Sequence, residues 1–198
     1  MFTGIIEEVG TVREVGEGDL SIRARVVLWG TNLGDSISVN GVDLTAKHFD
    51  EEGFSANVMP ETYRRSNLGD LRAGDPVNLE RSLQLAGRVS GHLVRGVVEA
   101  TGALVSFTPE AEAIIMRIEA PPDILRHMVV KGPVAIDGIS LTVTEKDDRS
   151  FCVSLVQYTQ ENTNLGARKP GDRLNLETDI IARYVDQMLE DRRDAGAV

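Results

Sequence analysis

The feature that most constrains the fold of this chain is an internal repeat. Residues 39–45 read Val-Asn-Gly-Val-Asp-Leu-Thr, and residues 136–142 read Ile-Asp-Gly-Ile-Ser-Leu-Thr. Aligning each residue from 34 to 80 with the residue 97 positions later gives 14 identities in 47 positions without a gap. Chance at ordinary residue frequencies would give about three. The repeat therefore predicts a duplicated fold.

The opening of the chain is repeated as well, at a shorter offset. Residues 4–10, Gly-Ile-Ile-Glu-Glu-Val-Gly, align with residues 96–102, Gly-Val-Val-Glu-Ala-Thr-Gly. The offset is 92 here and 97 later, so the second copy has five extra residues. These fall around Pro121-Pro122-Asp123, and we predict a short helix over residues 124–129 because Pro and Asp suit a first helical turn.

Each copy has the pattern of several short strands separated by turns. Asn40-Gly41 and Asp137-Gly138 are strong hairpin signals between β-branched and aliphatic runs. Further strands are expected at residues 54–59 and 76–80 and at 151–156. Short strands with regular glycine turns predict a small closed barrel for each copy. We expect an N-terminal barrel domain over residues 1–91, with a linker at 82–91, and a C-terminal barrel domain over 92–178.

The remaining residues, 179–198, predict a helix and tail. Asp179 can cap the helix. The apolar residues that follow have the spacing of one stripe on a helix: Ile181, Tyr184, Val185, Met188 and Leu189. Neither repeat has an equivalent, so we expect this stripe to pack against another subunit. Docking on the chain's own barrel is the alternative.

Composition excludes several classes of partner and site. The formal charge is −10, which argues against nucleic acid and against an anionic membrane surface, because both are polyanions. The single cysteine, Cys152, rules out an intrachain disulfide and a cysteine-based metal cluster. Without a basic leader or an apolar run of membrane-spanning length, the chain is expected to be cytoplasmic.

Several phrases in order then resemble one family, riboflavin synthase. They are the opening Met-Phe-Thr-Gly-Ile-Ile-Glu-Glu-Val-Gly, the repeated Gly-x-x-Leu-Thr, Glu61-Thr62 with Ser66-Asn67-Leu68-Gly69, Val-Asn-Leu-Glu-Arg at 77–81, and Ser-Gly-His-Leu-Val at 90–94. The resemblance extends from Met1 to about Leu189. It implies a mainly β protomer of two tandem six-stranded Greek-key barrels, with a C-terminal α-helix that assembles a homotrimer.

The resemblance also implies an activity. In that family two molecules of 6,7-dimethyl-8-ribityllumazine dismutate to riboflavin and 5-amino-6-ribitylamino-uracil, without a metal or cofactor. Two related pockets from neighbouring subunits would hold the two ligands face to face, which lowers the entropic cost of the reaction. An association with lumazine synthase is left open.

Site residues follow from the resemblance, position by position. The first pocket is predicted to contain Gly4, Ile5, Ile6, Asp43, Leu44, Thr45, Asn57, Val58, Met59, Glu61, Thr62, Gly96, Val97 and Val98. The second is predicted to contain Lys131, Ser140, Leu141, Thr142, Ser154, Val156, Tyr158 and Thr159. Apolar side chains suit a lumazine ring, and hydroxyl and carboxylate groups suit its polar edge and ribityl chain.

Three more roles each have a plain structural alternative. Phe2 is expected to pack over a ligand ring, or else to anchor the first strand. Asp179 is expected near the acceptor ligand and also as the helix cap. Lys131 could direct its ammonium group at the pyrimidine carbonyls, or be an ordinary surface lysine.

His92 is expected to satisfy a backbone group between the barrels.

The sequence departs from the family in the first pocket. Asp43 stands where typical members have a cysteine, and Val97 where they have a histidine. In the second pocket Tyr158 replaces a usual glutamate. Asp43 could act as a general base or hold a water nucleophile. On this interpretation the chain is expected to be an enzyme, and its catalytic residues are expected to be Asp43, Ser140, Asp179 and Phe2. The alternative is a non-catalytic lumazine- or flavin-binding protein of the same fold.

Overall fold

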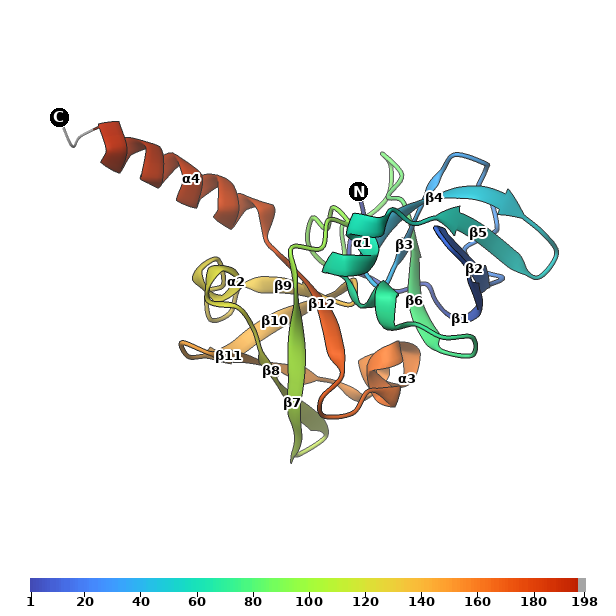
Figure 1. The fold of residues 1–198 in the computed structure, drawn as a ribbon. Coiled ribbons are helices and arrows are strands. Elements are labelled where there is room, and N and C mark those ends of the chain that lie inside the picture. Colours follow the sequence, from blue (N-terminus) through green and yellow to red (C-terminus); the bar gives the residue numbers. More distant parts are fainter. Residues whose placement is uncertain (196–198) are drawn as a thin grey trace.

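The computed structural model describes residues 1–195 of the chain. Two closed six-stranded barrels lie next to each other, and a long C-terminal helix extends away from them (Figure 1). The strands of the first barrel are β1 (Glu8–Val15), β2 (Asp19–Arg23), β3 (Ser36–Val39), β4 (Val42–Phe49), β5 (Gly53–Asn57) and β6 (Pro76–Arg81). Those of the second are β7 (Ala100–Glu110), β8 (Ala113–Glu119), β9 (Pro133–Ile136), β10 (Ile139–Lys146), β11 (Ser150–Leu155) and β12 (Arg173–Thr178).

The two barrels have the same topology. Around the first, the strand order is β1-β2-β5-β4-β3-β6, and the second closes in the equivalent order, with every neighbouring pair antiparallel. The 97-residue offset is kept by the short helices: α1 (Pro60–Arg65) and the 3₁₀ turn η1 (Asn67–Asp70) match α3 (Gln157–Asn162) and η2 (Asn164–Ala167). The predicted pair of Greek-key barrels is confirmed.

The predicted hairpins form as the turn residues dictate. Asn40 and Gly41 have φ of 48° and 78°, and Asp137 and Gly138 have φ of 46° and 80°. Two successive positive φ values are typical of the tight turn whose twist matches that of antiparallel strands. Val39 therefore pairs with Val42, and the second hairpin has the same register.

Alternation along β4 decides where a ligand site can lie. Val42, Leu44 and Ala46 are buried in the first barrel, whereas Asp43 and Thr45 are exposed between them. Successive strand residues face opposite sides of a sheet, so the buried side chains fill the barrel interior and Asp43 faces outward. Any site built on the Gly-x-x-Leu-Thr phrase is consequently on the outer surface of the barrel.

The barrels meet at the two hairpin turns. A Cβ added at Gly41 would lie 2.7 Å from the backbone nitrogen of Gly138, and one added at Gly138 would lie 2.7 Å from that of Gly41. Only residues without a side chain allow the two backbones to approach so closely. The equal distances show that the repeats are related here by an approximate twofold axis.

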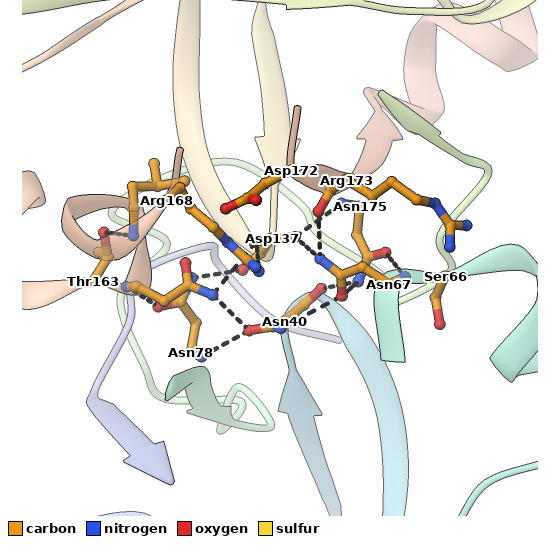
Figure 2. A network of polar contacts seen from close by, with 12 residues as sticks. Asn40, Ser66, Asn67, Asn78, Asp137, Thr163, Arg168, Asp172, Arg173 and Asn175 are labelled. Carbon is orange, nitrogen blue, oxygen red and sulfur yellow. Dashed lines mark hydrogen bonds and ion pairs between the residues drawn. The ribbon is translucent and has the colours of Figure 1, made fainter. Parts of the chain in front are cut away.

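A buried polar network surrounds this contact (Figure 2). Its core members are Asn40, Asn67, Asn78, Asp137, Asn164 and Asn175, none more than 2% exposed. Asn164 donates its backbone N–H to Asn78 Oδ1 at 2.7 Å, and Asn67 donates its own to Asn175 Oδ1, also at 2.7 Å. Because buried polar groups are costly unless paired, these reciprocal bonds fix how one barrel sits against the other.

The helices show one correction and one confirmation. The short helix predicted over residues 124–129 is instead α2 (Pro122–Arg126). It begins earlier because Pro122 takes the first helical position. At its other end, Lys146 Nζ donates to the carbonyls of Leu125 and Met128. The longer helix is α4 (Ile180–Ala195), and Asp179 caps it as predicted, with Oδ1 accepting from the Ile181 N–H at 3.0 Å.

The apolar stripe of α4 is not covered by any of residues 1–195. Its five residues, 181, 184, 185, 188 and 189, are 46–64% exposed. Ion pairs from α2 hold the middle of the helix, including Arg126 to Asp186 at 2.7 Å and to Glu190 at 2.6 Å. Docking of the stripe on its own barrel is therefore wrong. No helix in residues 1–195 has the length and apolar character needed to cross a membrane.

Candidate functional site

Two segments cross between the barrels and build the sites. The first crossing segment, residues 2–6, precedes the first barrel, and the second, residues 94–98, precedes the second barrel. They meet in a short antiparallel bridge, in which Phe2 donates to the Val94 carbonyl at 2.7 Å. Beyond this bridge each segment reaches the outer face of the other repeat's barrel.

The second crossing segment lies against Asp43. Asp43 donates its backbone N–H to the Gly96 carbonyl at 2.9 Å. A Cβ at Gly96 would lie 2.6 Å from the Asp43 Cβ, so glycine is required for this approach. Farther along, Val98 packs against the core of the first barrel.

The first crossing segment lies against Ser140 in the same way. Ser140 donates its backbone N–H to the Gly4 carbonyl at 2.8 Å. A Cβ at Gly4 would lie 2.6 Å from the Ser140 Cβ, and Ile6 packs against the core of the second barrel. The expectation that Gly4, Ile5 and Ile6 lie with Asp43 is wrong. A repeat alignment identifies equivalent residues but not which barrel each copy contacts.

The segment at Asp43 closes one side of a small cavity, the Asp43 pocket. Its volume is about 250 Å³. It is lined by Val42, Asp43, Glu61, Thr62, Arg65, Ser66, Gly96, Val97 and Val98. Five of the predicted first-pocket positions besides Asp43 are thus brought together: 61, 62 and 96–98. Sequence reasoning missed Val42, which adjoins Asp43, and also Arg65 and Ser66, which follow Thr62 by three and four positions.

The chemistry of the Asp43 pocket is mixed. The valines at 42, 97 and 98 offer apolar surface, while the Asp43 and Glu61 carboxylates are acceptors. Glu61 forms ion pairs with Arg64 at 2.6 Å and Arg65 at 2.5 Å, and these guanidinium groups lower the pKa of its carboxyl. Apolar walls with a few convergent polar groups are typical of small-ligand sites.

Other predicted first-pocket residues do not line this cavity. Leu44 and Val58 are core residues of the first barrel, only 4% and 2% exposed. Three others are exposed: Thr45 on strand β4, Asn57 at the end of β5, and Met59 before α1. In the second repeat Leu141 is likewise buried, whereas Thr142, Val156 and Tyr158 are exposed and Ser154 and Thr159 are half-buried. Strand alternation explains why neighbours in sequence separate in this way.

Gly4, Gly91 and His92 lie against Ser140, and these four residues are called the Ser140 site. It contains a pairing that sequence reasoning missed. His92 Nδ1 lies 2.7 Å from Ser140 Oγ, so the prediction that His92 satisfies a backbone group is wrong. Burial lowers the pKa of His92, and the Asp179 carboxylate acts against that effect. A neutral imidazole can accept the serine proton. The neighbouring Gly91 allows this approach, because a Cβ there would lie 2.7 Å from the Ser140 Cβ.

Phe2 and Lys131 occupy unusual positions. Phe2 is fully buried and clusters with Val94 and Ala135, which favours the anchoring interpretation over a ring stacked on a ligand. Lys131 is exposed and has φ of 69°, where the first repeat has Gly34 with φ of 90°. A side chain in this left-handed region costs free energy.

A larger cavity, about 490 Å³, lies beside the linker and is bounded by residues such as Trp29, Arg81 and Arg88. Ile5 is the one predicted site residue on it. It lacks both Asp43 and Ser140, so the chemistry described above belongs to the smaller sites.

The fold and its two crossing segments define a class of protein: a tandem-barrel protein in which each barrel is contacted by the segment that precedes the other barrel. The family model of the lumazine binding domain matches residues 3–82 and 95–179. Each matched stretch includes a crossing segment and the barrel that follows it.

Relatives that match nearly the whole chain narrow this class. The riboflavin synthase of Mycobacterium bovis is 47% identical over 99% of this chain and 100% of that protein. The riboflavin synthase of Actinobacillus pleuropneumoniae is 45% identical over 96% of this chain and 90% of that protein. The chain belongs to the riboflavin synthase family, and it carries the lumazine binding domain twice.

Solved structures show the same fold at lower identity. The crystal structure of LumP complexed with riboflavin matches with a TM-score of 0.84 and 21% identity, covering 90% of this chain and all of that one. LumP complexed with 6,7-dimethyl-8-(1'-D-ribityl) lumazine matches with a TM-score of 0.81.

Proposed function

We propose that this protein is an enzyme, a riboflavin synthase, which dismutates two molecules of 6,7-dimethyl-8-ribityllumazine to riboflavin and 5-amino-6-ribitylamino-uracil. The observation that carries the proposal is the pair of equivalent sites, at Asp43 and at Ser140. Each is built with a crossing segment, and the two segments are copies of one repeated sequence. A reaction between two copies of one molecule requires two such sites. The full-length similarity to riboflavin synthases supports the same reaction.

The reaction moves a four-carbon unit from one lumazine to the other. The donor becomes the uracil product, the acceptor becomes riboflavin, and no external oxidant is needed. The protein's main task is therefore to align two ligands and to move protons between them.

We assign the ligand contacts by the chemistry of each site. In the Asp43 pocket the valines at 42, 97 and 98 would cover the ring, and Glu61 and Thr62 would accept and donate hydrogen bonds at the ribityl chain. At the Ser140 site, the equivalent positions include Tyr158 and Thr159. Tyr158 cannot accept as a carboxylate does, so we expect weaker recognition of the ribityl chain there.

Proton handling is assigned to different groups at the two sites. Asp43 faces the Asp43 pocket beside Val97, and we propose that its carboxylate acts as the base or holds a water nucleophile in place of the family's cysteine and histidine. At the Ser140 site, the His92 imidazole accepts the Ser140 proton, and Asp179 favours the charged imidazole that results.

The two reacting ligands are expected to come from neighbouring subunits. The Asp43 pocket contains no residue of the Ser140 site, so one chain does not present both ligands in one cavity. The exposed stripe of α4 provides a surface for assembly, and we propose the homotrimer that the family resemblance implies.

One assay tests the function. Purified protein is incubated with 6,7-dimethyl-8-ribityllumazine, and riboflavin formation is followed by absorbance. We expect turnover that produces one riboflavin for two lumazines consumed. Stoichiometric binding without turnover would instead show a lumazine- or flavin-binding protein, the alternative that Asp43 and Val97 raise. Failure to bind at all would contradict both functions.

A further inference from the structure

Two buried glutamates with no role in the chemistry above hold the crossing segments. Glu80 is at the end of β6 and Glu177 near the end of β12, and they are only 4% and 3% exposed. They are equivalent under the 97-residue repeat. Lone buried carboxylates are costly unless hydrogen bonded, so each one needs a set of donors.

Most of the donors are backbone N–H groups of the crossing segments, and the Arg95 guanidinium also forms an ion pair with Glu177 at 3.7 Å. Glu177 accepts from Arg95 at 2.7 Å and from Gly96 and Val97 at 3.0 Å each. Gly96 has φ of 81°, which turns successive N–H groups toward one point. Such an arrangement is a backbone anion nest, occupied here by a side chain of the same protein.

Glu80 makes the equivalent bonds at the other segment. Its carboxylate accepts from the Thr3 N–H at 2.6 Å, the Thr3 hydroxyl at 2.8 Å and the Gly4 N–H at 3.0 Å. Gly4 also has a positive φ, 76°. Charge-assisted bonds of this kind are stronger than neutral ones, so the segment positions are fixed more tightly than those of an ordinary loop.

The same glycines, Gly96 and Gly4, connect the two glutamates to the two sites. The Gly96 carbonyl accepts from the Asp43 N–H at 2.9 Å, and Gly96 and Val97 line the Asp43 pocket. The Gly4 carbonyl accepts from the Ser140 N–H at 2.8 Å. Each glutamate therefore reaches a ligand site on the barrel to which it does not belong.

We propose that Glu177 and Glu80 are positioning residues that act crosswise: Glu177, in the second barrel, shapes the Asp43 pocket of the first, and Glu80, in the first barrel, shapes the Ser140 site of the second. Burial raises the pKa of both carboxyls, and the N–H donors act against that effect. The inference rests on the proposed function, because it needs a ligand at each site.

The test uses the full-length protein and riboflavin labelled with ¹³C in its ring methyl groups. NMR signals of bound riboflavin are assigned to sites by the variants Asp43→Asn and Ser140→Ala. Glu177→Gln keeps the side-chain volume but turns an NH₂ group toward a backbone N–H. For Glu177→Gln we expect about tenfold weaker binding of the riboflavin whose signals respond to Asp43→Asn. The affinity of the riboflavin that gives the other signals should change less than about twofold. Glu80→Gln should show the converse.

The controls separate positioning from loss of fold. Glu51→Gln, at an exposed turn position in the first barrel, should change neither set of signals. If a glutamine variant does not fold, Glu177→Asp and Glu80→Asp keep the charge and shorten its reach, and the same crosswise pattern is expected. A folded variant that weakens the site of its own barrel, or both sites equally, would overturn the inference. Wild-type protein that binds no riboflavin would overturn the proposed function and the inference with it.

Discussion

Asp43 is the residue on which the proposed function depends most directly. Its carboxylate is exposed in the pocket next to Val97 and Thr62. Asp43→Asn keeps the shape of the side chain and removes the base. We expect turnover to fall about 100-fold or more, with little change in lumazine binding. Steady-state kinetics and a binding titration measure the two effects. Undiminished turnover would remove Asp43 from the mechanism.

The role proposed for His92 gives turnover a pH dependence with a definite sign. Because burial lowers its pKa, the neutral imidazole, the form proposed to accept the Ser140 proton, persists below the usual histidine range. Turnover should therefore be retained as the pH falls through about 6.5, the ordinary histidine value, and be lost at lower pH. The pH profile of kcat measures this loss of turnover at low pH. His92→Gln should abolish the pH-dependent loss, and an unchanged profile in that variant would contradict the role of His92 as the proton acceptor.

Lys131 keeps an unfavourable backbone conformation that its counterpart Gly34 adopts freely. Lys131→Gly should raise the free energy of unfolding by about 0.5–1 kcal/mol, since it removes left-handed strain against a small entropic cost. It should also lower turnover, because the ammonium group is lost. Urea denaturation and kinetics test the pair of effects. Gly34→Lys is the matched control and should destabilise by a similar amount; a Lys131→Gly variant with unchanged turnover would make Lys131 a surface residue.

At the level of elements, α4 leaves an apolar stripe exposed. A chain ending at Thr178 should be monomeric, and Val185→Asp should weaken assembly because it places a charge in the stripe. Gln187→Asp, on the same helix but outside the stripe, is the control. Sedimentation equilibrium gives the oligomeric state. A trimer that persists after truncation would contradict the assignment of assembly to α4.

Elements also show what the sequence could and could not predict. The 97-residue offset predicted both hairpins and both strands at the Gly-x-x-Leu-Thr phrase, because turn chemistry and strand alternation are local. The crossing of residues 2–6 and 94–98 was missed, since equivalent segments can pair within a repeat or between repeats with the same local pattern. The His92–Ser140 contact joins residues 48 positions apart, and no periodicity relates them.

Across the whole molecule, the contact of Gly41 with Gly138 decides whether the two barrels can dock. Gly41→Ala puts a Cβ 2.7 Å from the partner backbone nitrogen, so we expect a loss of about 3 kcal/mol or more. Gly74→Ala is the matched control: Gly74 has φ of 97° but no atom within 4 Å of the added Cβ, and should cost only about 1 kcal/mol. Thermal unfolding compares them, and equal losses would show that the junction tolerates the methyl group.

The crossing segments have a consequence for what counts as one binding unit. A single repeat contains a barrel and a segment, but that segment completes the site of another barrel. A chain with only one repeat would have to pair with a second copy of itself and exchange segments to complete either site. The present chain is in effect such a pair joined end to end. Joining the copies lets their two sites diverge, as Asp43 and Ser140 have, while one shared geometry holds both.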